Sequence, residues 1–440
     1  MTRFIGLDAH KRAAEVCIVD PEGRVLQRHR IAGNREALLD FARQHLGGDD
    51  QLALEATFHT WALVDLLAPW VGRIVVSNPL RTKAIALAKV KTDRIDAKVL
   101  ADLLRAGYLP EVWQPDAETR RWRQLTHRRA ALVADRTAIK NRIHSTLDQR
   151  LVEVPYKDLF GKQARQWLEQ LELDEDGRFI LDTDLQLLEQ LETQIQRLDD
   201  RIAPLAYQQQ QVRLLMTLPG VDTIVALGLL AAWGDPRRFP DARRAASALG
   251  LAPSTRQSGD HCYHGRITKQ GNSHARWLLI QAAQHLDKHP GPLGVFFRRI
   301  AQKKNRNVAV VAAARKLATI AWLMLRNNEP YRYAQPKTIQ AKLAKLRIRA
   351  TKTRRRGGIP KGSKRPENYG SGQAFKTTPP LAIVLEKEHL SPPTALADLP
   401  PGERRMLQRT NTLNYAKSLN TNNIRPRKTA PKPTGQLTSS

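Results

Sequence analysis

The sequence predicts an α/β domain followed by a mainly helical part. Three short segments, 3–8, 13–19 and 24–31, are predicted as the strands of a meander, because each is rich in apolar residues and ends at a polar break. Helices and strands alternate after them, which is the order of an RNase H-like fold, and we expect that fold for residues 1–116. From residue 117 the apolar residues recur with helical spacing instead.

Local signals support the elements of the first domain. Asp20-Pro21-Glu22-Gly23 is a turn sequence between the second and third strands. Asn34 is expected to cap the first helix, because its side chain can accept from a free backbone N–H. A strand over 51–55, a helix around 61–67 and a strand over 73–77 complete the predicted order.

The composition indicates a nucleic-acid partner. The 440 residues contain 72 Lys and Arg against 42 Asp and Glu, a formal net charge of +30. A basic excess of this size favours a polyanion such as DNA or RNA. No signal peptide and no apolar run long enough to span a membrane stand out, so we expect a cytoplasmic protein without a membrane partner. Two cysteines, Cys17 and Cys262, exclude a disulfide framework and a Cys-rich zinc site.

Residues 117–211 are expected to form a helical and coiled-coil region. Apolar residues alternate at spacings of three and four there, as in the a and d positions of a heptad; they are Leu188, Leu191, Ile195, Leu198, Ile202 and Leu205. The same pattern also suits a helical hairpin that closes on the helix over 130–147 of the same chain. The sequence leaves both readings open.

Residues 212–333 are expected to form a mainly helical C-terminal domain. Its Leu-Pro-Gly-Val sequence at 218–221 resembles the turn of a helix-hairpin-helix, whose amides can hold a phosphate, although a plain packing turn fits equally well.

Residues 334–440 follow this domain as a basic tail. From residue 337 onward the tail contains 22 Lys or Arg and five Asp or Glu, together with many Pro, Gly, Thr and Asn residues. We expect this basic tail to be disordered and to add non-specific grip on nucleic acid.

Four carboxylates stand at positions that suit a metal site. Asp8 and Glu55 each follow an apolar run, at the carboxyl end of a predicted strand, where ligands of open α/β sheets bind. Thr92 suits a helix N-cap, which places Asp93 and Asp96 on one face of the first turns, although acids also occur there as simple caps. A cluster of four acids repels itself unless it holds a cation, and oxygen ligands suit Mg²⁺ (or Mn²⁺). Two such ions are the apparatus of in-line phosphodiester chemistry.

A polar loop is expected from Ser254 to Ser273. It interleaves hydroxyls and glycines with Arg256, Arg266 and Lys269, as a phosphate-binding surface would, although a solvated loop is the simpler alternative. The long helix before residue 148 is also basic, so its outer face could lie along a phosphate backbone. The candidate nucleic-acid-binding residues of that helix are Arg120, Arg128, Arg129 and Lys140.

Several sequence blocks occur together in one order. They are Gly-Leu-Asp-Ala-His-Lys at 6–11, Leu-Glu-Ala-Thr at 54–57, Lys-Thr-Asp-Arg-Ile-Asp-Ala at 91–97, Leu-Pro-Gly-Val at 218–221, and the stretch 249–272. In this order they resemble the transposases of the insertion-sequence-110 family, also called DEDD transposases or bridge-RNA-guided recombinases. The resemblance covers roughly residues 3–330 and leaves out the basic tail, for which we expect no catalytic role.

The resemblance implies an N-terminal RuvC-like (resolvase-like) domain whose four Mg²⁺-binding acids fall on Asp8, Glu55, Asp93 and Asp96. It also implies a C-terminal serine transposase domain whose catalytic serine falls on Ser258. In the family this serine attacks the DNA backbone and holds one strand as a phosphoserine. The resemblance further implies a homo-oligomer, a dimer or tetramer assembled through the 188–205 seam, and target choice by a guide (bridge) RNA.

Three classes of function remain open from the residues themselves. A transposase or recombinase needs the acids, a nucleophile and assembly. A metal-dependent nuclease or junction resolvase needs only the acids and leaves no covalent adduct, and a binding scaffold needs only the charge. Ser254, Ser273 and Tyr263 compete with Ser258 as nucleophiles, and Ser258 is favoured because the resemblance points to it and Arg256 is near in sequence.

Overall fold

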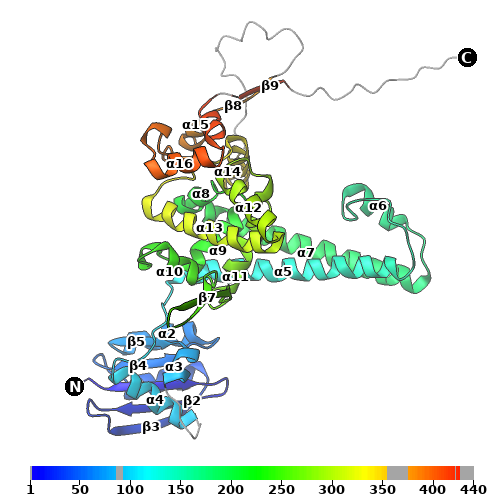
Figure 1. Ribbon diagram of the computed structural model, residues 1–440. Helices are drawn as coiled ribbons and strands as arrows, with labels where there is room; N and C mark the ends of the chain where they lie inside the picture. Colours follow the sequence, from blue (N-terminus) through cyan, green and yellow to red (C-terminus); the bar gives the residue numbers. More distant parts are fainter. Residues whose placement is uncertain (1, 86–92, 354–374, 422, 427–440) are drawn as a thin grey trace, which may run out of the picture. The chain divides into compact units, whose positions relative to one another are not determined.

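The structure, a computed structural model, describes residues 2–85, 93–353, 375–421 and 423–426 (Figure 1). The chain forms two compact units, Met1–Pro115 and Asp116–Ser440. The predicted Thr92 cap lies outside the described residues.

The first unit is built on a five-stranded mixed sheet in the order β3-β2-β1-β4-β5. β1 pairs antiparallel with β2 and β2 pairs antiparallel with β3, so the predicted meander is confirmed. The predicted strands 51–55 and 73–77 are also present, and they join the sheet in parallel with β1. This order fits the expected RNase H-like fold. The strands are β1 (Phe4–Ala9), β2 (Ala13–Val19), β3 (Val25–Ala32), β4 (Gln51–Glu55) and β5 (Arg73–Ser77).

Helices cover both faces of this sheet. α1 (Arg35–His45) and α2 (Thr60–Leu67) pack on one face, and the Asn34 side chain accepts from the backbone N–H of Ala37 as the sequence predicts. α4 (Asp93–Arg105) packs on the other face, where its apolar residues meet β1, β2 and β4. α3 (Pro79–Ile85) follows β5.

The second unit carries a long helical arm. α5 (Ala117–Asp148) and α7 (Glu175–Gln208) lie side by side, and α6 (Lys162–Gln170) packs near their free end (Figure 1). Leu188 is buried against residues of α5, and Ile195 and Ile202 of the same seam are also buried. The 188–205 heptads therefore close a hairpin within one chain, so the intramolecular reading is the one observed. The prediction that copies of the chain assemble through residues 188–205 therefore has no support from the fold, because α5 of the same chain packs against the buried residues of this seam.

The rest of the second unit forms one helical core. α9 lies at its centre, because the sequence there is apolar all round and every residue from Val225 to Trp233 is buried. The helices and strands outside the arm are α8 (Gln210–Leu215), α9 (Thr223–Trp233), α10 (Ala242–Ser247), β6 (Pro253–Ser258), β7 (His261–Ile267), α11 (Ser273–Ala283), α12 (Pro292–Lys303), α13 (Arg306–Asn327), α14 (Pro336–Thr351), β8 (Phe375–Thr378), α15 (Leu381–Glu386), α16 (Pro401–Arg409), α17 (Leu413–Ser418) and β9 (Asn423–Pro426).

The prediction of a disordered tail is wrong for much of 334–440. α14 buries Ile339, Leu343 and Leu346 in the same core as α9, and α15 adds Leu381 and Leu385. The basic composition concealed this pattern, because each helix carries its few apolar residues on one face. Removing everything after Tyr333 would therefore strip the core rather than only weaken binding to nucleic acid.

α13 is long and apolar enough, by length and composition alone, to cross a membrane, although no such stretch was expected from the sequence. Its Ala313, Leu317 and Ala321 are fully buried in the core of the second unit. Burial inside the protein therefore accounts for its composition.

The contribution of α14 can be tested at Leu343, which is 1% exposed. We expect Leu343→Ala to lower the free energy of unfolding by about 2–5 kcal/mol, because the lost methyl groups leave a cavity. Denaturant unfolding followed by circular dichroism measures this change. Lys345→Ala, at an exposed position of the same helix, is the control and should change it by less than about 0.5 kcal/mol. Equal stability of the two variants would contradict the packing of α14.

Candidate active site

Asp8 lies on the face of the sheet that α4 covers. Ile5 and Leu7 of β1 pack into the core beneath α1 and α2, so the alternating residues Gly6 and Asp8 point to the opposite face. A Cβ atom at Gly6 would lie 1.9 Å from the carbonyl oxygen of Ala97. Only glycine therefore allows α4 to cross β1 this closely, and the crossing brings the start of α4 to the end of β1.

Glu55 occupies the corresponding place on the next strand. The parallel register pairs Leu7 of β1 with Leu54 of β4, so the next residues, Asp8 and Glu55, lie beside one another at the carboxyl ends of the two strands. Ala53 packs with the α4 residue Leu100, which puts Glu55, two residues on, at the same face as Asp8. Asp8, Glu55 and α4 thus share one face and one edge of the sheet, as the sequence predicts.

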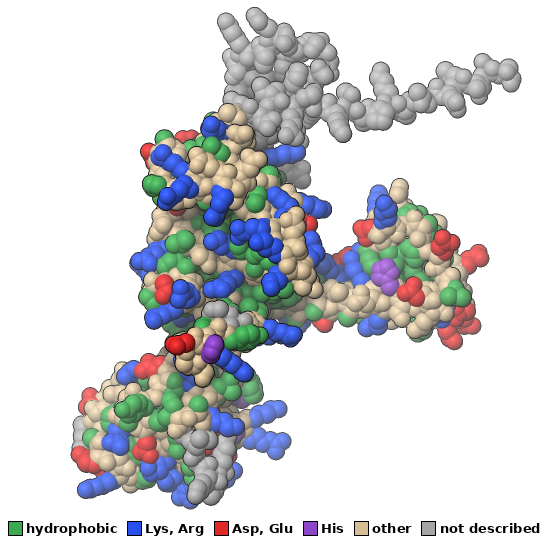
Figure 2. All heavy atoms as spheres, in the orientation of Figure 1, with side chains coloured by type: hydrophobic (Ala, Val, Ile, Leu, Met, Phe, Trp, Pro, Cys, Tyr) green, Lys and Arg blue, Asp and Glu red, His purple; other side chains and the backbone are tan. Residues whose placement is uncertain are grey.

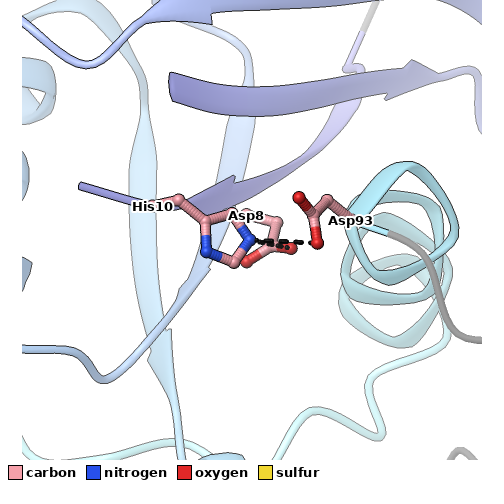
Figure 3. A group of neighbouring side chains, drawn as sticks. All are labelled: Asp8, His10 and Asp93. Carbon is pink, nitrogen blue, oxygen red and sulfur yellow. Dashed lines mark hydrogen bonds and ion pairs between the residues drawn. The ribbon is translucent and has the colours of Figure 1, made fainter. Parts of the chain in front are cut away.

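Asp8, His10 and Asp93 form a close group (Figure 3). The Nε2 atom of His10 lies 3.2 Å from Oδ2 of Asp8 and 3.2 Å from Oδ1 of Asp93. The ligand-forming atoms of the three residues all lie within 4.8 Å of one another. His10 was not predicted as a site residue, although its position two residues after Asp8, on the same side of an extended chain, could have indicated it.

The electrostatics of this group favour a bound cation. Burial raises the pKa of the Asp8 carboxyl, His10 opposes the rise, and the charges of Asp93 and Asp96 add to it. Asp8 is 14% exposed, whereas Asp93 is 59% exposed and open to solvent. Carboxylates that make each other's ionisation costly gain stability when a cation offsets their charge. The structure thus brings Asp8 and Asp93 together, with Asp96 near enough to affect Asp8.

Ser258 lies at the tip of a β-hairpin in the second unit. The expected polar loop is instead the antiparallel pair β6–β7, with Ser258 opposite His261 across a two-residue turn. Gly259 begins this turn with φ +56°, as two-residue hairpin turns require. Ser258 is exposed. The alternating pattern was hidden from the sequence analysis because both strands are polar on both faces.

The base of this hairpin is fixed to the helical core. Nη1 of Arg276 on α11 donates to the carbonyls of Leu249 (3.0 Å) and Lys269 (3.1 Å). The backbone N–H of Asn272 donates to the carbonyl of Ala248, and its side chain caps α11. The hairpin therefore holds its exposed tip on a rigid support.

The competing nucleophiles differ from Ser258 in their surroundings. Ser254 lies at the base of the hairpin and is partly covered, and a Cβ atom at Gly265 would come within 2.5 Å of its Oγ. Ser273 begins α11. Tyr263 is 70% exposed on β7. Ser258 and Tyr263 are thus the exposed candidates on the hairpin strands.

The predicted nucleic-acid-binding cations fall into two groups. Arg256, Arg266 and Lys269 are exposed on or beside the hairpin, and Arg128 is exposed on α5. Arg129 instead forms an ion pair with Asp199 of α7 (2.5 Å), and Lys140 lies over the Phe160 ring. These last two serve the packing of the arm, whereas Arg120, which is partly exposed, stays a prediction.

The Leu-Pro-Gly-Val turn serves packing. Nζ of Lys342 on α14 donates to the carbonyls of Met216, Leu218 and Val221, at 3.1, 2.9 and 2.7 Å. A Cβ atom at Gly220 would lie 2.1 Å from the carbonyl oxygen of Ala282, so α11 covers this turn. The plain packing turn is therefore the reading that the contacts support.

Comparison with known proteins identifies the chain's relatives. A transposase model of the IS110 type matches residues 5–151, and a model described as "Transposase IS116/IS110/IS902 family" matches 212–293. Together they cover 229 of the 440 residues. The chain belongs to the IS110 family of transposases.

Three relatives illustrate the range of this similarity. The y4qE transposase of Sinorhizobium fredii is 32% identical over 195 residues, which are 44% of this chain and 48% of that protein. A family 20 transposase of Pseudomonas aeruginosa is 27% identical, over 74% of this chain and 98% of its own length. The pilin gene-inverting protein of Moraxella lacunata is 26% identical, over 74% and 97%.

The IS110-family acids fit a divalent metal. Carboxylate oxygens that share one sheet edge suit Mg²⁺ or Mn²⁺. The pKa of Asp8 is raised chiefly by burial and to a lesser extent by the charges of Asp93 and Asp96, and a bound cation would offset both effects. Asp8 and Asp93 would hold it, with Glu55 and Asp96 close by on the same face. Glu15 adds charge to this face, because it lies opposite Asp8 on β2, but Arg30 lies 3.6 Å from its carboxylate.

Removal of the Asp8 charge should stabilise the metal-free protein. The Asp8 pKa is higher in the folded than in the unfolded chain, so the free energy of unfolding falls as the pH rises from the unfolded pKa to the folded pKa, and the loss is complete above the folded pKa. We expect Asp8→Asn to raise the melting temperature without metal and to lose the further rise that Mg²⁺ gives. Differential scanning calorimetry with and without Mg²⁺ measures both. Asp40→Asn, at an exposed position of α1, is the control; an Asp8→Asn variant that still responds to Mg²⁺ would contradict the site.

The contact of His10 with both acids predicts a role in metal selectivity. Imidazole suits transition metals, whereas Mg²⁺ prefers oxygen. We expect His10→Ala to weaken the affinity for Mn²⁺ more than that for Mg²⁺, as measured by calorimetric titration. His29→Ala, on β3, is a matched control and should leave both affinities unchanged. If His10→Ala weakened the affinities for Mn²⁺ and Mg²⁺ equally, His10 would position the acids and would not itself bind the metal.

Proposed function

We propose that this IS110-family transposase cleaves and exchanges DNA strands through a covalent phosphoserine at Ser258, with Mg²⁺ or Mn²⁺ held at Asp8, Glu55, Asp93 and Asp96. The observation that carries the proposal is the hairpin tip, where Ser258 is exposed and Gly259 leaves space for a backbone to approach. A nuclease or resolvase would need only the acid site and has no use for such a tip. The metal would supply charge neutralisation at the reacting phosphate when bound.

Two residues of the hairpin, Ser258 and Arg256, have roles in this proposal. Ser258 supplies the oxygen that bonds to phosphorus, and the sugar oxygen of the cleaved strand leaves with a proton from solvent. Attack by the hydroxyl of a second strand then restores Ser258 and joins the strands, so the number of phosphoester bonds is conserved. Arg256 lies two residues away on the same side of β6, where it can bind the phosphate.

The partners follow from charge and family. Figure 2 shows Lys and Arg side chains spread over the visible face of the part built by α8–α16, whereas Asp and Glu gather toward the free end of the arm. We infer that DNA contacts the cationic face, because a basic excess of +30 favours a polyanion. We also infer that a guide (bridge) RNA selects the target, and this inference rests on the family resemblance. We also infer a dimer or tetramer in which the hairpin of one copy serves the acids of another, acting in the cytoplasm.

The covalent intermediate provides the test. Ser258→Ala should abolish the protein–DNA adduct and lower recombination by orders of magnitude, because the exchange loses the intermediate that preserves the bond. DNA affinity and metal binding should remain, since neither depends on one hydroxyl. Trapping under denaturing conditions, followed by mapping of the modified peptide, measures the adduct. Ser254→Ala and Ser273→Ala are controls that should keep it; an adduct mapped to Tyr263 would refute the proposal.

A further inference from the structure

The two strands of the hairpin present different side chains on their two faces. Residues directly opposite one another in an antiparallel pair project to the same side. The register pairs Ser258 with His261 and Arg256 with Tyr263, and strand alternation puts both pairs on one face. Gln257 and Cys262 form the pair between them and lie on the other face. One face thus combines a hydroxyl, an imidazole, a guanidinium and a phenol.

The Ser258–His261 pair closes the two-residue turn. Ser258 and His261 are directly opposed, and such residues have Cβ atoms about 4.5–5.5 Å apart, so rotation of the two exposed side chains can bring an imidazole nitrogen to the serine Oγ. Both side chains are exposed. Both remain available to an incoming phosphodiester.

We propose that His261 is the general base that activates Ser258. This inference rests on the proposed function, because it assigns a residue to the same covalent step. Serine is a weak nucleophile until a base removes its proton, and a neighbouring histidine is the usual base. His261 accepts the Oγ proton as the Oγ–phosphorus bond forms and the bond from phosphorus to the leaving sugar oxygen breaks. In the second step, the hydroxyl oxygen of the second strand bonds to phosphorus and the Oγ–phosphorus bond breaks. The protonated imidazole returns its proton to Oγ, and the proton of the attacking hydroxyl passes to solvent.

The other groups on this face fit the same step. Arg256 can bind the phosphate that Ser258 attacks, and Tyr263 stands opposite Arg256, one pair further from the tip. Asp260 belongs to the turn, and it is exposed. The titratable and charged groups near His261 on the hairpin are therefore Asp260, Arg256 and Tyr263.

The test uses the full-length protein with its DNA and measures the rate of adduct formation from pH 5.5 to 9. We expect the wild-type rate to rise with pH and then level off, because a general base accepts a proton only in its unprotonated form. His261→Gln should lower the rate by about 10²–10⁴-fold and abolish this rise. Cys262→Ala is the matched control, because it is adjacent and on the opposite face, and it should retain both the rate and the profile.

A second variant separates chemistry from structure. His261→Ala should regain part of its adduct rate when imidazole is added, which a residue needed only for folding would not allow. An adduct rate for His261→Gln within twofold of wild type at pH 6 and pH 8 would overturn the role of His261. An adduct that persists in Ser258→Ala would instead overturn the proposed function itself, so the two failures are distinguishable.

Discussion

The acid site depends on how closely α4 crosses β1. Because Gly6 has no side chain, the carbonyl of Ala97 can approach the strand to a distance that any Cβ would block. The first turn of α4 then reaches the end of β1, where Asp93 shares His10 with Asp8. A larger residue at position 6 would shift the helix outward and separate the two carboxylates. A glycine with no chemistry of its own thus determines the geometry of the acids.

Much of the first unit was predictable because its signals are local. Buried strands are short apolar runs, Asn34 caps the next helix, and acids follow the runs at strand ends. The rule that the carboxyl ends of parallel strands meet is sufficient to bring Asp8 and Glu55 together. Asp93 lies on α4, and its approach to Asp8 depends on the close crossing of α4 over β1. The place of His10 in the site was not predicted, because a single polar residue after a strand belongs to no pattern of apolar residues. Its contact with Asp93 also depends on where α4 lies in the folded chain.

The second unit was harder for physical reasons. Ile339, Leu343 and Leu346 recur at helical spacing, but the cations around them dominate the composition, so average hydrophobicity indicates disorder where a buried face exists. A heptad pattern predicts that one apolar face of a helix is buried against another helix. It does not predict whether that other helix belongs to the same chain. Ion pairs also connect α5 with α7. Arg142 and Asp184, for example, are 42 positions apart in the sequence, so their contact could not be inferred from either helix alone.

The acids and the hairpin belong to different compact units, and this separation bears on the chemistry. A strand-exchange enzyme must keep its covalent phosphoester from water while strands change partners. Uncatalysed hydrolysis of phosphate esters is among the slowest of reactions, so the ester is safe wherever no metal activates the attacking oxygen. In the proposed mechanism Ser258 belongs to one compact unit and the metal-binding acids to the other, so the phosphoserine does not share a compact unit with the metal. A nuclease gains nothing from this division, because water is its intended nucleophile.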